Sequence, residues 1–306
     1  MEKSIFKMEH LDPLLECDNA NIEITKKCLY EIEPKSLDAI EQCAGTLDNL
    51  GILYGEKCDY DKHHAVVAEW AGNFDLNGDT ALELLKSATI IGDAREDKTD
   101  VAMESMYKAV SILAKLLLTL RLKRDFLFSI SDFLRLKVTP ALGYLRIQSE
   151  TFGILKLLNE NSKLGEEWFD SAFSSSGKSF HNKWHSQIVR VIRDFGLYDD
   201  YSRGSNMALH TRASGIAMGW LVGSNIKRKK AEIKLTYQEI DDPRQLFFWF
   251  GILLRFYRKA LINADIIFPE LSAGDFDKAG VTSFFEIEDA MWAKAVQAYN
   301  AMKTNR

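Results

Sequence analysis

Long runs of apolar residues at helical spacing are the feature that most constrains how this chain folds. From about residue 100 onward, apolar side chains recur at intervals of three and four residues, the period of an amphipathic α-helix. Only 5 prolines interrupt the 306 residues, and 46% of the residues are hydrophobic, as in ordinary globular proteins. We therefore predict an all-α (mainly α) fold: a long-helix bundle with a smaller N-terminal helical region and at most a short β hairpin.

Prolines, glycines and capping residues set the bounds of the expected helices. We expect helices at residues 36–54, 61–72, 79–91, 101–124, 139–160, 165–173, 179–195, 198–221, 243–267 and 282–302. Residues 126–138 either continue the helix before them or form their own. Thr139 followed by Pro140 indicates an N-cap and a first helical position. Residues 231–237 alternate apolar and polar side chains, which indicates a short strand or hairpin arm.

Charge is distributed unevenly along the chain. Residues 1–100 carry 22 acidic and 10 basic side chains, whereas residues 101–306 carry 22 acidic and 29 basic ones, within a net charge of −5. Such asymmetry indicates either two regions that attract each other or a basic body that meets an anionic partner. The stretch 94–100 is charged and lacks periodicity. We therefore predict an acidic N-terminal helical region at 1–95 and a helical-bundle domain at 96–306.

The cysteines and the N-terminus indicate a reducing compartment. All four cysteines fall in the first 58 residues, at Cys17, Cys28, Cys43 and Cys58. None of them forms a C-x-x-C pair, so a zinc knuckle is not supported and buried thiols are expected. The N-terminus lacks an apolar run of secretory length, and no apolar stretch reaches the roughly 20 residues that a membrane span needs. We expect a cytoplasmic protein with no membrane partner.

The candidates for metal binding are weak at the sequence level. His181 and His185 are four residues apart, which suits two ligands of one ion. However, no glutamate follows the first histidine, as metalloprotease chemistry requires. The stretch that begins at Asp275 resembles a calcium loop but has Ala279 at a ligand position. The chain also lacks glycine-rich phosphate loops and the G-x-S-x-G motif of hydrolases. We predict no metal and no other cofactor.

The densest group of polar side chains lies at residues 198–212, in a chain that is otherwise rich in apolar residues. If this segment is helical, Arg203 and His210 lie about 20° apart around the axis, with Asn206 roughly between them. Polar residues on a helix that packs against neighbours either bond internally or carry out chemistry. We therefore expect the functional site of this protein here.

A second helix supplies partners for that group. Arg146 and Glu150 are four residues apart among apolar neighbours, so this ion pair can face inward. A buried arginine–glutamate pair is costly unless other polar groups bond to it. We therefore predict a polar cluster of residues from the two helices: Arg146, Glu150, Tyr198, Tyr201 and Ser205.

This arrangement resembles bacterial helical-bundle families of unknown function and the HEPN superfamily, whose ribonucleases carry arginine, four to six residues, then histidine. Arg203 and His210 fit that spacing, although Gly204 stands where those enzymes usually have a polar residue. The resemblance covers at most residues 100–225. It implies metal-independent RNA cleavage by a dimer, with His210 as general acid/base, Arg203 stabilising charge on the phosphate and Asn206 orienting the scissile group.

Two functions of different classes follow from these observations. The leading hypothesis is a soluble helical-bundle protein that acts by association, either with a partner protein or with a second copy of itself as a homodimer. The alternative is the HEPN-type endoribonuclease, and a metal-dependent enzyme at His181 and His185 comes third. Whether the chain is an enzyme stays open.

If the chain binds RNA, a basic run would contact the backbone phosphates: Lys227, Arg228, Lys229 and Lys230.

Overall fold

The computed structural model describes residues 12–59, 100–171, 180–205, 220–225, 230–235 and 242–304 of the chain. In these residues the fold is mainly helical with one two-stranded hairpin, which confirms the predicted fold class. The elements are α1 (Asp12–Ile32), α2 (Ser36–Lys57), α5 (Asp100–Leu134), α6 (Val138–Glu160), α7 (Lys163–Asp170), α8 (Phe180–Asp194), α9 (Tyr198–Gly204), β1 (Trp220–Asn225), β2 (Lys230–Leu235), α11 (Pro243–Leu261), α12 (Ala264–Ile267), α13 (Ala273–Ala279) and α14 (Val281–Thr304). Among them, no helix combines the length and the apolar character that crossing a membrane requires.

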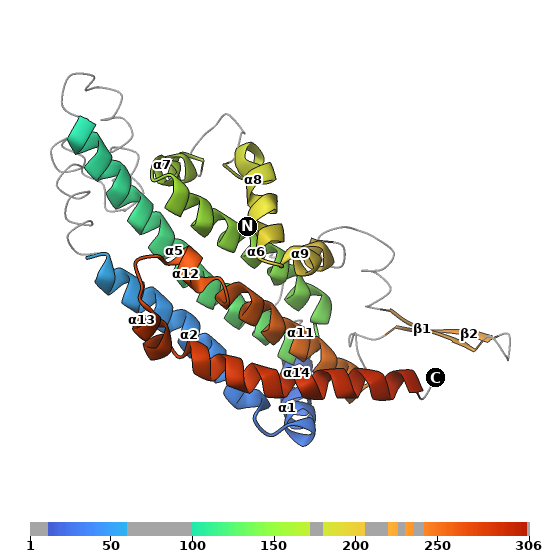
Figure 1. Ribbon diagram of the computed structural model, residues 1–306. Coiled ribbons are helices and arrows are strands. Elements are labelled where there is room, and N and C mark those ends of the chain that lie inside the picture. Colours follow the sequence, from blue (N-terminus) through green and yellow to red (C-terminus); the bar gives the residue numbers. More distant parts are fainter. Residues whose placement is uncertain are drawn as a thin grey trace, which may run out of the picture.

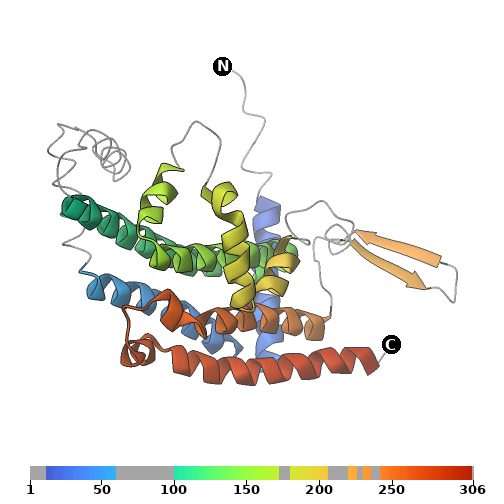
Figure 2. The same ribbon diagram turned by 45° about the horizontal axis from the view of Figure 1, so that its top comes forward.

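The long helices pack in two layers (Figures 1 and 2). Helices α5 and α6 form an antiparallel pair, and α11 and α14 form a second antiparallel pair beside them. Helix α2 contacts both pairs, and α1 packs across α2, α5 and α11. The shorter helices α8 and α9 pack on α6 and α7 packs mainly on α5, all on the side away from α14. This arrangement places α6 in the middle of the fold.

One hydrophobic core joins these layers. Its largest buried side chains are aromatic rings, most of them from α5, α6 and α11, such as Phe126 and Tyr257, whose ring centroids lie 4.8 Å apart. Leu29 of α1 and Leu47 of α2 belong to the same core. The helices before the predicted boundary at residue 95 thus share their core with the helices after it. The boundary itself lies outside the described residues.

The turn between α5 and α6 differs from the prediction in its capping. Helix α5 continues through residues 126–134, which was one of the two expected possibilities. Leu136 adopts a left-handed conformation with φ 62°, and Lys137 occupies the N-cap of α6. The prediction of Thr139 as N-cap is therefore wrong by two residues. Pro140 still lies in the first turn, where backbone N–H groups have no partner within the helix.

The segment after α9 also differs from the prediction. The expected helix 198–221 is helical at Tyr198–Gly204, but residues 220 and 221 belong to strand β1. Strand β1 pairs antiparallel with β2, with Trp220 opposite Leu235, so the predicted strand-like arm at 231–237 is confirmed as part of a hairpin. A short apolar run such as 220–222 does not distinguish a helix from a strand.

The helices predicted at 61–72 and 79–91 lie outside the described residues.

Close approach of α11 and α14 yields a test of the fold. A Cβ added at Gly251 would lie 2.5 Å from Cβ of Ala295, so Gly251→Ala should lower the free energy of unfolding by about 1–3 kcal/mol. Gly45→Ala in α2 is the matched control, because a Cβ there has no neighbour within 4 Å. It should stabilise the protein by up to about 1 kcal/mol through helix propensity. Urea denaturation followed by circular dichroism measures both, and equal stability of the two variants would contradict this packing.

Candidate functional site

The structure brings most of the predicted polar cluster together between α6 and α9. Arg146 Nε lies 3.1 Å from Glu150 Oε1, and Arg146 Nη1 donates to Ser205 Oγ at 2.6 Å. The same guanidinium lies over the ring of Tyr201, 5.3 Å from its centroid. Tyr198 stacks on Tyr201 with 6.1 Å between centroids. Arg146 thus bonds through Nε and Nη1 to two partners within the protein, as expected of a structural ion pair.

Gly204 explains how the two helices approach closely enough for these bonds. A Cβ at this position would lie 2.7 Å from the carbonyl oxygen of Leu142 and 2.9 Å from the backbone nitrogen of Arg146. Any larger residue would therefore push α9 away from α6. HEPN ribonucleases usually have a polar residue at this position, whereas the packing of α9 on α6 in this chain requires glycine.

Arg203 lies on the other side of α9 and bonds to a buried carboxylate. Its Nη1 donates to Asp200 Oδ1 at 2.9 Å, and Lys259 Nζ of α11 donates to the second oxygen at 2.8 Å. The Asp200 side chain is only 4% exposed, so these two cations compensate a charge that is withheld from water. Arg203 also lies 5.9 Å from the ring centroid of Trp249. These contacts attach α9 to α11.

The remaining predicted site residues are not described. Asn206 and His210 lie outside the described residues, and so do Lys227, Arg228 and Lys229. Lys230 begins strand β2, but its side chain is not described. The structure therefore leaves open whether Arg203 and His210 face a common site.

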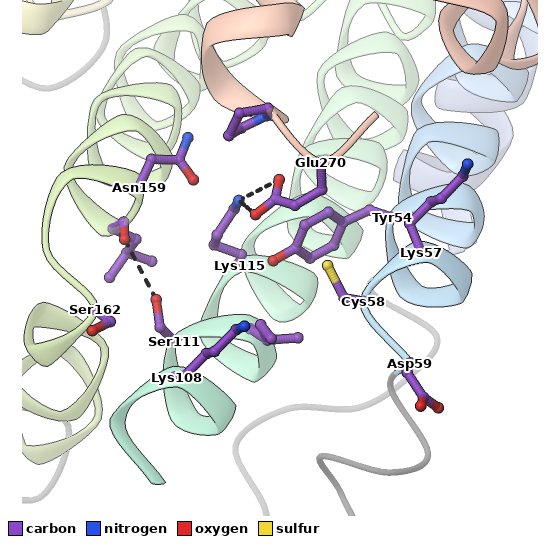
Figure 3. Close-up of a pocket in the computed structure, with 13 residues that line it drawn as sticks. Tyr54, Lys57, Cys58, Asp59, Lys108, Ser111, Lys115, Asn159, Ser162 and Glu270 are labelled. Carbon is purple, nitrogen blue, oxygen red and sulfur yellow. Dashed lines mark hydrogen bonds and ion pairs between the residues drawn. The ribbon is translucent and has the colours of Figure 1, made fainter. Parts of the chain in front are cut away.

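A cavity that the sequence did not reveal lies between α2, α5, α6 and the segment that follows α12 (Figure 3). Its volume is about 400 Å³, within the range of small-molecule sites. Most of the side chains around it are polar: Tyr54, Lys57, Cys58, Asp59, Lys108, Ser111, Lys115, Asn159, Ser162 and Glu270. This cavity is the best-formed candidate for a binding site among the residues described.

Lys115 is the buried charge of this cavity. Its side chain is 3% exposed, and its Nζ lies 2.8 Å from Glu270 Oε1 and 3.0 Å from Oε2. The ammonium also lies over the ring of Tyr54, 4.5 Å from the centroid. Burial lowers the pKa of Lys115, and the hydrogen bond to Glu270 opposes that effect. The pair thus holds a cation at the inner wall of the cavity.

Tyr54 presents a buried hydroxyl to the same space. Figure 3 shows this hydroxyl directed toward Lys115 and the interior of the cavity. The Cys58 thiol interacts with this hydroxyl, but no nitrogen or oxygen atom of the described residues forms a hydrogen bond with it. Burial raises the pKa of Tyr54 and also that of Cys58. Both groups are therefore protonated at neutral pH.

The rim of the cavity carries a cation that is not neutralised. Lys108 is exposed, lines the cavity and has no acidic partner within the described residues. Lys57, by contrast, lies 3.2 Å from the buried carboxylate of Asp275. Ser111 and Ser162 add hydroxyl groups on the side of the cavity away from Lys57, as Figure 3 shows. The lining is thus rich in hydrogen-bond donors.

One sequence signal pointed toward this site. Lys115 interrupts the apolar run 110–122, on a helix whose neighbouring positions are buried. A lysine at such a position must either extend its ammonium group to water or form an ion pair with a carboxylate. Its partner Glu270 is distant in the sequence, so no local pattern identified the pair.

The chain does not place three metal ligands together where it is described. No group of three or more histidine, cysteine, aspartate or glutamate side chains suited to a metal ion occurs among those residues. His181 and His185 lie on α8, and Nδ1 of His185 is 3.2 Å from Nε2 of His181. The calcium-like stretch that begins at Asp275 instead forms α13, with Ser272 and Asp275 in a capping box.

Comparisons of the chain with protein-family models, with curated proteins and with solved structures gave no match. They therefore neither support nor oppose the HEPN resemblance, which stays a prediction. The case for a site rests on the geometry described above.

The buried ion pair yields a prediction about stability. Glu270→Gln should lower the free energy of unfolding by about 1–3 kcal/mol, because it leaves Lys115 charged and without its partner. The loss is smaller than for a fully buried pair, since the Glu270 side chain is 34% exposed. Lys115→Met should cost less, because it removes the buried charge and keeps the apolar stem. Urea denaturation of both variants measures this, and a larger loss for Lys115→Met would contradict it.

Proposed function

We propose that this protein binds a small molecule carrying a phosphate or carboxylate group in the cavity beside Lys115. The observation that carries the proposal is the set of donors around the cavity. Lys108 is a cation without an acidic partner among the described residues, and the buried Tyr54 hydroxyl has no nitrogen or oxygen partner there. A buried hydroxyl without a partner costs free energy that a bound acceptor restores.

The charges of the cavity favour an anion over a neutral ligand. Glu270 is already bonded to Lys115, so it offers little attraction to a second cation. Asp59 also lines the cavity, but Figure 3 shows its carboxylate directed away from the interior, so Lys108 is the charge at the entrance that attracts anions and bonds to their oxygen atoms. Tyr54 and the serine hydroxyls of the lining then orient the bound group. The volume of about 400 Å³ suits a metabolite-sized molecule.

Thermal unfolding with a defined set of probes tests this proposal. We expect pyrophosphate or citrate to raise the melting temperature, whereas glucose, a neutral molecule, should not. A ligand at 100 times its Kd stabilises a protein by about 2.7 kcal/mol, which is roughly 5 °C for a chain of this size. Lys108→Gln should abolish most of the shift. Lys123→Gln is the control, because Lys123 lies on the same helix but pairs with Asp48.

Two results would contradict anion binding in this cavity. One is the absence of any shift with either anion, and the other is a shift that Lys108→Gln and Lys123→Gln reduce equally. The second result would indicate general attraction of anions to surface lysines. Protection of Cys58 from a small thiol reagent by the same probes gives an independent readout, because Cys58 lines the cavity.

Association of two copies of this chain is the second candidate function, and an apolar surface supports it. Ile52 of α2 and Leu117 and Leu120 of α5 are 52%, 48% and 47% exposed. Leu120 also lines a shallow hollow of about 390 Å³ between these helices. Exposed apolar surface of this kind is typical of protein interfaces.

If two copies associate through this surface, a single charged substitution in it should disrupt the dimer. Leu120→Glu should convert the dimer to a monomer, because it places a carboxylate in the centre of the apolar surface. Light scattering coupled to size-exclusion chromatography measures the mass. A monomeric wild-type protein at high micromolar concentration would contradict this second candidate.

The nuclease hypothesis has no specific support from the described residues. Arg203, one half of the proposed motif, is bonded to the buried Asp200. The other half, His210, lies outside the described residues. The hypothesis stays a prediction, and an RNA cleavage assay that compares the chain with its His210→Ala variant tests it.

A further inference from the structure

Helix α8 carries two imidazole groups whose nitrogen atoms face each other. His181 and His185 are one turn apart, and Nδ1 of His185 lies 3.2 Å from Nε2 of His181. The ring centroids are 5.0 Å apart and the rings are inclined by 61°. Both side chains reach the solvent, since His181 is 32% exposed and His185 is exposed. An ion from solution therefore has access to this pair.

The separation of the two nitrogens fits shared coordination of one ion. Two nitrogen ligands at about 2.0–2.1 Å from a tetrahedral zinc ion lie about 3.3 Å apart. Without an ion, the same distance suits a hydrogen bond in which one neutral imidazole donates to the other. Binding of an ion therefore requires the donating imidazole to carry its proton on the other ring nitrogen, so that both facing nitrogens offer a lone pair to the ion.

Glu150 of α6 lies behind this pair in the position of an outer carboxylate. Its Oε2 is 3.8 Å from Nδ1 of His181, the nitrogen that does not face His185. Its other oxygen, Oε1, is held by Arg146 at 3.1 Å. A carboxylate on the far nitrogen of a metal-binding histidine fixes the tautomer and raises the basicity of the ligand. The polar cluster between α6 and α9 thus supports His181.

Two cations near the histidine pair are each paired with a carboxylate. Arg146 is bonded to Glu150, and Lys183 lies 2.7 Å from Glu167. These pairs reduce the electrostatic repulsion that a divalent cation would meet at α8.

We propose that His181 and His185 bind one divalent ion of the copper, nickel and zinc class, with Glu150 as the outer carboxylate of His181. Imidazole is a preferred ligand of these ions. Since no group of three ligating side chains occurs among the described residues, water completes the coordination and leaves positions open for exchange. The ion links the first two turns of α8 to α6 through Glu150. This inference does not depend on the cavity beside Lys115.

Titration of the full chain with Cu²⁺ tests the proposal. Calorimetry gives the affinity, and electron paramagnetic resonance reports nitrogen atoms bound to the copper. His185→Ala should lower the affinity of this site at least about tenfold, and Glu150→Gln should lower it about tenfold while both histidines remain. Ser186→Ala is the control, because Ser186 is an exposed residue on the same helix and should leave binding unchanged. Circular dichroism confirms that each variant is folded.

The results of this titration either support or overturn the proposed ion site. Loss of one binding event and of its nitrogen signal in the His181→Ala/His185→Ala double variant supports the site. Binding that this double variant retains in full would overturn it, since the copper would then be held by other histidines. The absence of binding to the wild-type chain would overturn it as well. Equal affinity of Glu150→Gln and Ser186→Ala would overturn the role of Glu150.

Discussion

The structure depends on the burial of helix α5, whose apolar side chains require cover along most of its 35 residues. No single neighbour is long and wide enough to exclude water from such a surface, so α2, α6 and α7 each cover a part of it. Helix α11 then closes the core through aromatic contacts such as Phe126 with Tyr257. Because α2 precedes α5 by more than 40 residues and α11 follows it by more than 100, the core joins both ends of the chain.

Buried charges attach α9 and α14 to α11. Asp200 receives Arg203 from its own helix and Lys259 from α11. Glu288 of α14 is fully buried and receives Arg255 of α11 at 2.8 Å. Burial raises the pKa of Glu288, while the two α11 arginines, Arg255 and Arg258, act against that effect. Removal of the cation from any of these carboxylates lowers the free energy of unfolding, because it leaves a buried charge without a partner. Each cluster therefore fixes one helix against another. The Lys115–Glu270 pair differs, because it borders a cavity and not only the packed core.

Part of the candidate sites could be predicted from local spacing. Arg146 with Glu150 and His181 with His185 are separated by four residues, so a helix alone places them side by side. We predicted contacts of Arg146 with Ser205 and Tyr201 because both helices carry polar side chains. In the structure, the close approach of the helices at Gly204 allows these contacts. The cavity beside Lys115 could not be found in this way. Its residues come from segments more than 200 positions apart, and apart from Lys115 each of them alone resembles an ordinary surface or core residue.

The sequence by itself determined the mainly helical fold, the existence of a short hairpin arm and most helix bounds after residue 100, because these follow from periodicity and from capping residues that act over a few positions. The tertiary structure alone decided which helices share the core, where the helix after Tyr198 stops, and which carboxylate neutralises each buried cation. The reason is physical: hydrogen bonds within a turn depend on neighbouring residues, whereas desolvation of a charge or an apolar face depends on whatever segment the completed fold places against it.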